Sequence, residues 1–336
     1  MNRLVCLMLL CLLSSGANAV DIKPYIVNGS TANISNYPSF ASLFYRNGDS
    51  YSTSAYCGAT MINSQYVLTA AHCIYNDNNL MLYTVVAPQL EDESNFLSNQ
   101  QAKAQAFYYP DNYINSEAER WPNDIAIIKL ETPLVISNYS YLINSTVNNS
   151  FATNDDYKAV GHGYTEENVA GGSQLLQTSL TYVDTATCQS VFGSQISSSQ
   201  LCFDGALGST YKNATCSGDS GGPVYWYSGG QYVQIGITSF GPATCGDSSI
   251  NVTSVFTDVY DYQNWISRVI NGLETPKVYV EVRDGRRVLI NNDTGGAQSS
   301  APQSDGGGGG SLPVSTLIVL VLIAYQRFRY RLHLSL

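Results

Sequence analysis

Short apolar and aromatic runs, each broken by glycine, asparagine, serine or proline, follow one another along the chain from Ile26 to Gly272. Few stretches of this region carry the three-to-four-residue period of an amphipathic helix, so the pattern predicts a mostly β fold. The chain has 336 residues, of which 44% are hydrophobic. That is enough for one large core or two small ones, and it excludes a disordered or collagen-like chain.

One helix is expected at the end of this region, because apolar residues recur there in steps of three and four. Asp258 and Asp261 are the candidate N-caps, and Asn271-Gly272 provides a C-cap. The recurring apolar residues are Tyr262, Trp265, Ile266, Val269 and Ile270.

A β-hairpin is predicted within residues 273–291. Val278, Val280 and Val282 alternate with other residues, Asp284-Gly285 is a hairpin turn sequence, and residues 288–290 supply the returning strand. An isolated two-stranded hairpin is only marginally stable in water. We therefore expect it either to pack on the main body or to form part of a stalk.

The N-terminus has the parts of a secretory signal peptide, which we place at residues 1–19. Arg3 precedes an apolar run that ends in the small-residue cleavage sequence Ala-Asn-Ala at 17–19. Removal of this segment deletes Cys6 and Cys11 and leaves six cysteines. In a chain bound for an oxidising compartment, an even number favours three disulfides over metal ligands.

The C-terminus combines five glycines at 306–310, an apolar block at 312–325 and a group of arginines. The apolar block is roughly 21 Å long as a helix, short for a membrane core of about 30 Å. The Gly/Ser-rich linker (292–311) and the helix with its Arg tail (312–336) resemble the GlyGly-CTERM sorting signal of Gram-negative bacteria, which an intramembrane protease cuts. A plain membrane anchor is the alternative, and a GPI signal is less favoured. We expect a secreted or outer-surface protein.

Three short strings carry the chemistry. They are Thr-Ala-Ala-His-Cys at 69–73, Asn-Asp-Ile-Ala-Ile-Ile-Lys-Leu at 123–130, and Gly-Asp-Ser-Gly-Gly-Pro at 218–223. A match at all six positions of the last string is rare by chance, so this string alone is strong evidence of a functional motif. In the order His, Asp, Ser, the strings resemble those of the chymotrypsin/trypsin family of serine proteases over about 26–272. The resemblance implies an all-β fold of two packed antiparallel six-stranded β-barrels with a C-terminal helix.

The residue types fit one reaction. A serine hydroxyl is a poor nucleophile unless a base takes its proton, so Ser220 needs His72 within hydrogen-bond reach. Asp124 would accept the other ring N–H of His72, fix its tautomer and stabilise the imidazolium. The backbone N–H groups of Gly218 and Ser220 would hold the oxyanion. The predicted catalytic residues are therefore His72, Asp124 and Ser220.

The resemblance also implies the cysteine pairing and the mode of activation. The implied pairs are Cys57–Cys73, Cys188–Cys202 and Cys216–Cys245. Ile26 begins a sequence like the new N-terminus of an activated family member, whose ammonium group pairs with Asp219. Residues 20–25 are then an activation propeptide cut after Tyr25, by a protease that accepts aromatic residues, which includes the enzyme itself. The alternative is cleavage after Lys23 followed by aminopeptidase trimming.

The specificity pocket is expected to be uncharged. Trypsin-like members place an aspartate six residues before the nucleophile, and this chain has Ala214 there. Ser254 forms one wall and Gly241 leaves another open, which favours apolar or aromatic side chains. Asp247 is more easily explained as an exposed loop carboxylate than as a pocket charge. The pocket residues implied are Ala214, Thr215, Ser239, Phe240, Gly241 and Ser254.

Other polar residues receive structural interpretations. His162 stands between two glycines where the family often has tryptophan, so we interpret it as structural or cleft-lining. His333 has no role. Residues Glu91, Asp92 and Glu93 lie where some relatives bind calcium, but a solvated acidic loop explains them better, and we expect neither a metal nor a cofactor.

The sequence thus predicts a secreted endopeptidase that hydrolyses peptide bonds in proteins or peptides. An activating protease and a sorting protease are the other expected partners, and the tail implies transient or permanent membrane association. A net charge of −10 without a basic stripe argues against nucleic acid. The alternative function is a non-catalytic surface adhesin or binding module on the same scaffold.

Overall fold

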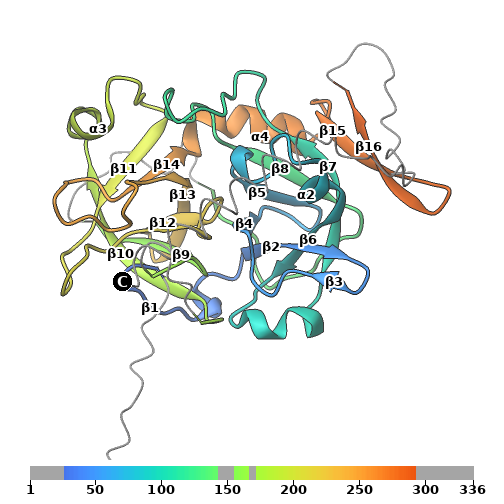
Figure 1. The fold of residues 1–336 in the computed structure, drawn as a ribbon, viewed down its shortest axis with the longest axis horizontal. Coiled ribbons are helices and arrows are strands. Elements are labelled where there is room, and N and C mark those ends of the chain that lie inside the picture. Colours follow the sequence, from blue (N-terminus) through green and yellow to red (C-terminus); the bar gives the residue numbers. More distant parts are fainter. Residues whose placement is uncertain (1–25, 143–154, 166–171, 293–336) are drawn as a thin grey trace, which may run out of the picture. The chain divides into compact units, whose positions relative to one another are not determined.

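The computed structural model describes residues 26–142, 155–165 and 172–292 (Figure 1). The expected signal peptide (1–19), the propeptide (20–25) and the C-terminal sorting signal (312–336) lie outside the described residues, as does the linker beyond residue 292. Among the described helices, none has the length and apolar character needed to cross a membrane.

Six antiparallel strands close the first barrel. The order β6-β2-β4-β5-β8-β7 is completed by pairing of β7 with β6, and the short β3 (Ser50–Tyr51) extends β2. Strand β7 alternates buried and exposed residues over its first half, as expected of a sheet with one face on the core. The strands are β2 (Phe40–Asn47), β4 (Cys57–Met61), β5 (Tyr66–Thr69), β6 (Thr84–Pro88), β7 (Ala102–Tyr108) and β8 (Ala126–Leu130).

Six further antiparallel strands close the second barrel. The order β10-β11-β14-β13-β12-β9 is completed by pairing of β9 with β10, and β1 (Ser30–Thr31) adds to the edge of β10. The strands are β9 (Tyr157–Gly161), β10 (Leu176–Val183), β11 (Gln200–Asp204), β12 (Pro223–Ser228), β13 (Gln231–Phe240) and β14 (Ser254–Asp258). The predicted fold of two six-stranded barrels is confirmed.

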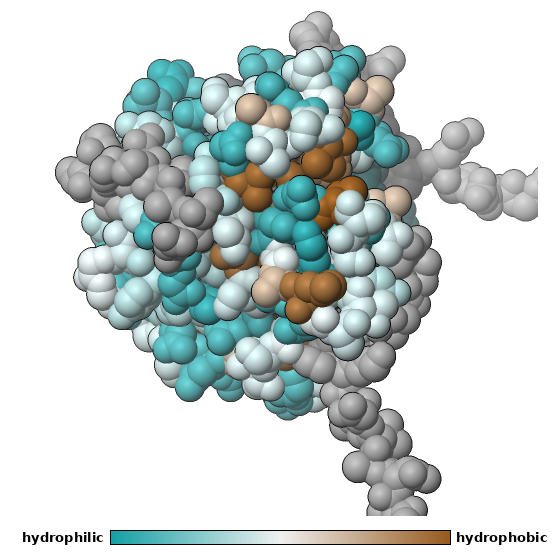
Figure 2. All heavy atoms as spheres, turned by 90° about the vertical axis from the view of Figure 1, so that its left-hand side faces the viewer, coloured by the Kyte–Doolittle hydropathy of each residue, from teal (hydrophilic) through white to brown (hydrophobic). Residues whose placement is uncertain are grey.

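One hydrophobic cluster joins the two barrels. It contains Phe107 and Ile127 of the first barrel together with Phe203, Ile237 and Phe256 of the second, and all five are fully buried. On the outside, the side formed by the second barrel carries several groups of hydrophobic atoms around a hydrophilic centre (Figure 2). Because this buried cluster contains residues of both barrels, the two barrels share one core.

Helices are few and short. The predicted C-terminal helix is α4 (Gln263–Ile270), preceded by a 3-10 turn, η4 (Tyr260–Tyr262). Asp258 accepts a hydrogen bond from the backbone N–H of Tyr260, the first residue of the 3-10 turn. Neither Asp258 nor Asp261 caps α4, whose N-cap position is Tyr262. Gly272, with φ +70°, follows the C-cap. The other helices are η1 (Ile34–Asn36), η2 (Ala71–Cys73), α2 (Asn78–Tyr83), η3 (Glu93–Ser98) and α3 (Thr185–Phe192).

Three disulfides join the pairs that the resemblance implies: Cys57–Cys73, Cys188–Cys202 and Cys216–Cys245. The first connects β4 to η2, the second connects α3 to β11, and the third connects the segment before β12 to the loop after β13. Each closes a loop of 14 to 29 residues, and loops of this size typically gain about 3 kcal/mol from closure.

A hairpin of β15 (Val278–Arg283) and β16 (Arg286–Asn291) packs on the first barrel. Strand β15 pairs with the end of β7, and Arg287 on β16 fixes the hairpin from the other side. The Arg287 guanidinium donates to the carbonyl oxygens of Leu82 and Ala104, each at 2.7 Å, and pairs with the carboxylate of Glu131. The hairpin is thus held by backbone pairing, by the burial of Val278 and Val280 in the main core, and by Arg287.

We predict that Arg287→Ala releases the hairpin while leaving the barrels folded. The change removes donors from two backbone carbonyls and one carboxylate, a loss of about 1–3 kcal/mol. Hydrogen exchange followed by mass spectrometry should show faster exchange across 278–291. The neighbouring Arg286 is exposed and makes no such contacts among the described residues, so Arg286→Ala is the matched control. Equal protection in both variants would contradict the anchoring role.

Candidate active site

The three predicted catalytic residues come from both barrels. His72 lies in η2, directly after β5, and Asp124 lies two residues before β8. Ser220 lies in the turn that leads into β12 of the second barrel. Strands β5 and β8 are neighbours with Thr69 opposite Ala126, so their ends bring His72 and Asp124 together.

The carboxylate of Asp124 is fully buried and accepts three hydrogen bonds. Its Oδ1 accepts from the backbone N–H of His72 at 2.9 Å. Its Oδ2 accepts from His72 Nδ1 at 2.7 Å and from the Ser239 hydroxyl at 2.6 Å. A buried carboxylate needs hydrogen-bond partners, so this set holds Asp124 in position.

The environment of His72 favours its protonated form. Burial by itself lowers the pKa of His72, but the charge of Asp124 and the hydrogen bond to it outweigh burial and raise the pKa above its usual value. Because Nδ1–H donates to Asp124, the neutral ring carries its lone pair on Nε2. His72 therefore has the tautomer that a general base needs.

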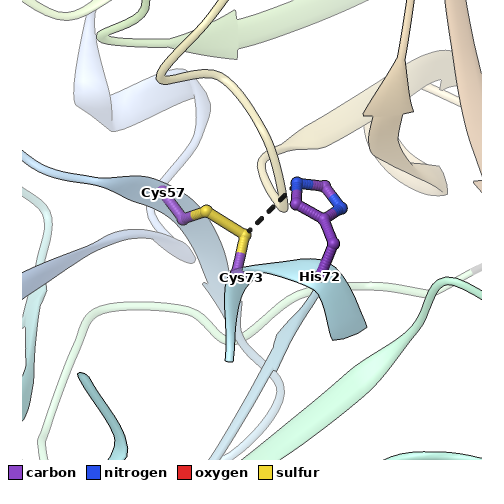
Figure 3. Close-up of side chains that lie close together, drawn as sticks. All are labelled: Cys57, His72 and Cys73. Carbon is purple, nitrogen blue, oxygen red and sulfur yellow. Dashed lines mark hydrogen bonds between the residues drawn. A yellow bond between two sulfur atoms is a disulfide. The ribbon is translucent and has the colours of Figure 1, made fainter. Parts of the chain in front are cut away.

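The Nε2 atom of His72 lies beside a disulfide (Figure 3). It is 3.8 Å from Sγ of Cys73, which is bonded to Cys57. These three residues are the one close group of metal-ligand types among the described residues. A disulfide has no thiolate to offer a metal and no proton to offer Nε2, so the lone pair is left free for another proton.

The expected hydrogen bond between His72 and Ser220 is not formed. Within the described residues no bond joins the two side chains, although both are partly exposed. Catalytic hydrogen bonds are often long in the absence of substrate and tighten when substrate binds. The structure therefore brings together His72, Asp124 and Ser239, and it leaves the Ser220 hydroxyl unpaired within the described part of the chain.

A tight turn presents Ser220 and its neighbours. The N–H of Asp219 donates to the carbonyl of Cys216 at 3.0 Å, and Gly218 has φ +98°, which favours glycine. Across the barrel interface, the N–H of Gly58 donates to the carbonyl of Ser220 at 2.8 Å. In the described residues the N–H groups of Gly218 and Ser220 have no protein acceptor. Two partly exposed donors therefore lie on either side of Asp219.

Behind this turn, Asp219 and the segment from Ile26 share a buried site. The Asp219 carboxylate accepts from the N–H groups of Gly163 at 2.7 Å and Cys216 at 2.9 Å, and burial raises its pKa to about 7. Ile26 is fully buried, and its N–H donates to the carbonyl of Gly163 at 3.3 Å. Val27 continues this contact by donating to the carbonyl of Ala214 at 3.1 Å.

Ala214, Thr215 and Ser254, three of the predicted pocket residues, are uncharged, and the last two are hydrogen-bonded to each other. Ala214 is fully buried. The Ser254 hydroxyl accepts hydrogen bonds from the N–H and the hydroxyl of Thr215, both at 3.0 Å. Asp247 accepts from the N–H and hydroxyl of Ser249 in its own loop. Of the remaining pocket residues, Ser239 bonds to Asp124, Phe240 is half-buried and Gly241 is exposed.

A family model described as Trypsin matches residues 26–266. The chain belongs to the trypsin family. The Chymotrypsin-like elastase family member 1 of Felis catus is 32% identical over 249 residues, which cover 73% of this chain and 89% of the relative. Its human counterpart is 32% identical over 250 residues, with 73% and 92% covered. The CLIP domain-containing serine protease B4 of Anopheles gambiae is 29% identical over 268 residues, with 74% and 71% covered.

Membership of this family makes the protein a trypsin/chymotrypsin-like serine endopeptidase that acts on proteins or peptides. The match runs from Ile26 through both barrels to within α4. It favours an enzyme over the non-catalytic adhesin.

The trypsin-family site contains two aromatic residues that the sequence analysis missed. The rings of Trp121 and Phe192 lie 5.2 Å and 5.4 Å from that of Phe240. Arg120 connects them, because its Nε donates to the carbonyl of Phe192 at 2.8 Å. Arg120 and Trp121 have positive φ values of +58° and +44°, a strained backbone for such residues. The position of Trp121, three residues before Asp124, was the only sequence signal for this group.

The acidic loop of this trypsin-family chain is not uniformly solvated, which corrects the prediction. Glu93 is 4% exposed and accepts a hydrogen bond from the N–H of Ala55 at 2.7 Å. Burial raises the pKa of Glu93 to about 7. Glu91 accepts from the N–H of Ile34, and hydrogen bonds led by that of Ser173 lower the pKa of Asp92 to about 2. The three carboxylates thus have different partners.

His162 is structural. It is 9% exposed and lies next to Phe40, with Nδ1 3.5 Å from the Ser42 hydroxyl. Burial lowers the pKa of His162 to about 4, so the ring is neutral at physiological pH. Of the two interpretations made from the sequence, the structure favours a buried histidine over one that lines the cleft.

We predict that Glu93→Gln flattens the pH dependence of stability. The folded-state pKa of Glu93 is about 7, against 4.5 for the free side chain, so the folded chain holds its proton longer than the unfolded chain. The free energy of unfolding therefore falls as pH rises from about 5 to 8, by up to about 3 kcal/mol for this group. Urea unfolding at the two pH values gives the free energy of unfolding at each, and the difference between them measures its pH dependence.

Glu91→Gln is the matched control, because Glu91 is an exposed carboxylate in the same loop. It should leave this pH dependence unchanged. If the free energy of unfolding of Glu93→Gln depends on pH as steeply as that of the unmodified protein, Glu93 ionises normally in the folded chain and the prediction is wrong.

Proposed function

We propose that His72, Asp124 and Ser220 are the catalytic triad of a secreted endopeptidase that prefers uncharged side chains before the cut bond. The observation that carries the proposal is the buried Asp124 carboxylate, which accepts from His72 twice and from Ser239 once. This arrangement orients the ring, fixes its tautomer and raises its pKa, which are the three things a general base next to a serine requires.

The reaction follows from these positions. The Ser220 oxygen attacks the carbonyl carbon of the peptide bond while its proton passes to Nε2 of His72. The tetrahedral oxyanion is held by the N–H groups of Gly218 and Ser220, which have no acceptor in the described part of the chain. Asp124 stabilises the imidazolium. His72 then gives the proton to the leaving amine, the C–N bond breaks, and an acyl-enzyme remains on Ser220.

Water completes the cycle. His72 takes a proton from a water molecule as its oxygen attacks the acyl carbon, and the same proton returns to Ser220 when the acid leaves. The enzyme is then in its starting state. Every proton transfer uses His72 Nε2, and the nearby disulfide carries no proton that could compete for its lone pair.

The preference for uncharged residues rests on the neutral pocket base. Ala214 brings no charge, and the hydroxyls of Thr215 and Ser254 are hydrogen-bonded to each other. A substrate lysine or arginine would lose its hydration there without gaining a carboxylate partner, which is unfavourable. Apolar and aromatic side chains meet no such penalty.

Secretion and processing complete the proposal. Three disulfides suit an oxidising compartment. The segment from Ile26 lies beside Asp219, where cleavage after Tyr25 would supply an ammonium group to a buried carboxylate. The tail at 312–336 resembles a sorting signal and would be removed or retained as a membrane anchor at the outer surface.

We predict that matched peptides ending in Phe or Ala are cleaved on the order of 100-fold faster than one ending in Arg, because only Arg must be buried without a counter-charge. The measurement is kcat/KM on chromogenic substrates. Ser220→Ala should abolish turnover, and Ala214→Asp should shift preference towards Arg. Fast cleavage after Arg by the unmodified enzyme would refute the neutral pocket.

We predict that the active protein begins at Ile26 and that Asp219→Asn lowers its kcat/KM at least about 100-fold by removing the partner of the new ammonium group. Asp247→Asn, in an exposed loop turn, is the control. N-terminal sequencing and the intact mass identify the cut and show whether residues 312–336 remain. Full activity with residues 20–25 still attached would be incompatible with this activation.

A further inference from the structure

A second pocket lies away from the candidate active site. Its volume is about 470 Å³, within the range of about 300–1,000 Å³ typical of small-ligand sites. It is lined by the segment that leads into β2, by the connection after β8 and by the β12–β13 hairpin. Six of its 13 lining residues are tyrosines, although tyrosine makes up only 25 of the 336 residues of the chain. They are Tyr37, Tyr139, Tyr141, Tyr225, Tyr227 and Tyr232.

Three of these tyrosines build a rigid floor. The rings of Tyr225 and Tyr232 lie 5.2 Å and 4.9 Å from that of Tyr37. The Tyr37 hydroxyl donates to Gln177 at 2.7 Å, and the Tyr225 hydroxyl lies 3.3 Å from that of Ser39. These groups are therefore ordered before any ligand arrives, which lowers the entropy cost of binding.

The other three tyrosines are exposed around the floor. Tyr139, Tyr141 and Tyr227 are 37%, 44% and 48% exposed, and they are three of the five tyrosines with this much exposure among the described residues. The ring of Tyr227 lies 5.0 Å from that of Tyr232, which continues the aromatic surface outwards. Exposed aromatic faces grouped on one pocket indicate a binding surface, because each has an apolar face and a polar tip.

The polar part of the pocket is neutral. The lining contains no charged residue. Three amide side chains, Asn36, Asn138 and Gln231, line it together with the tyrosines, and within the described residues none of them is hydrogen-bonded to a protein group. Each amide offers both donors and acceptors. A fitting ligand is therefore uncharged, has an apolar face, and has groups on its rim that both give and take hydrogen bonds.

We propose that this pocket binds a neutral carbohydrate. A sugar ring has an apolar C–H face that stacks on tyrosine and a rim of hydroxyls that both donate and accept, which matches the three amides. A proline-rich peptide also stacks on tyrosine, but it offers mainly carbonyl acceptors and would leave the amide oxygens unpaired. An ionic ligand would find no counter-charge.

The pocket can act without blocking the candidate active site. Strand β12 begins three residues after Ser220, and its residues Tyr225 and Tyr227 line the pocket. At about 3.3 Å per strand residue, Tyr227 lies about 13 Å along the strand from Pro223. The bound sugar would hold the endopeptidase on a glycan while the site stays open, and this inference does not depend on the proposed triad.

Titration calorimetry on the full chain carrying Ser220→Ala tests the proposal, with cellohexaose, chitohexaose, maltohexaose and mannohexaose as probes. At least one should bind, and Tyr141→Ala and Tyr227→Ala should each weaken it at least about tenfold. Tyr51→Ala, which removes a tyrosine of 41% exposure elsewhere, should not. With Ser220 intact, all three variants should cleave a small chromogenic peptide at the unmodified rate, which shows that they are folded.

Two sources of sugar are then separated. If the glycan belongs to the substrate, Tyr227→Ala should slow cleavage of a glycoprotein but not of its deglycosylated form. If it belongs to a polysaccharide surface, Tyr227→Ala should release the protein from the insoluble polymer of the sugar that bound. Absence of binding to all four probes, binding unaffected by both substitutions, or preferential binding of a proline-rich peptide at this pocket would overturn the proposal.

Discussion

The buried carboxylate of Asp124 is the contact on which the arrangement of the two barrels depends. It belongs to the first barrel and accepts from His72 of the same barrel, but Ser239 on β13 of the second barrel donates to the same oxygen. Thr257 on β14 adds a hydrogen bond to the Asp124 backbone carbonyl at 2.8 Å. A shift of one barrel against the other would remove the Ser239 hydrogen bond from a buried carboxylate, which is unfavourable. The same contact therefore aligns the barrels and prepares His72.

Asp219 is a second buried carboxylate, and it connects the chain before β1 to the turn that holds Ser220 through Gly163. Asp219 directly precedes Ser220 and accepts from the N–H of Gly163, whose carbonyl in turn accepts from the N–H of Ile26. Val27 then pairs with Ala214, the predicted base of the specificity pocket. The turn that holds Ser220, the pocket base and the segment from Ile26 are consequently one connected structure, so disturbance of any one of them reaches the other two.

Features encoded by short contiguous strings were predictable, and features built from distant segments were not. The strings around His72, Asp124 and Ser220 indicated the family, and with it the barrels and the cysteine pairs. Burial of Glu93 was missed because it depends on Ala55, 38 residues away, and a run of acidic residues normally indicates solvent exposure. The bond between His72 and Ser220 was expected from chemistry, but no bond joins the two in the described residues without substrate.

Helix ends show the same limit on a smaller scale. Asp258 was a candidate N-cap for α4, but a 3-10 turn lies between the two. The carboxylate of Asp258 accepts from the N–H of Tyr260 in that turn and does not reach α4. The contacts of Phe192 with Phe240 and the meeting of six tyrosines around one pocket depend on loops whose paths the local sequence does not specify. Such contacts follow from the barrels' topology, so they become visible only once the strands are placed.

The C-terminal hairpin also changes how the protein meets its own copies. Strand β7 pairs with β6 only at its start, through Ala102 and Lys103, and β15 pairs with its other end through Ala106 and Phe107. The free edge of this sheet is thereby moved to β16, which begins with Arg286 and Arg287. A short edge strand that carries an exposed arginine is a poor template for a second molecule, because strand pairing would desolvate the charge. The hairpin thus protects the barrel against aggregation through strand addition.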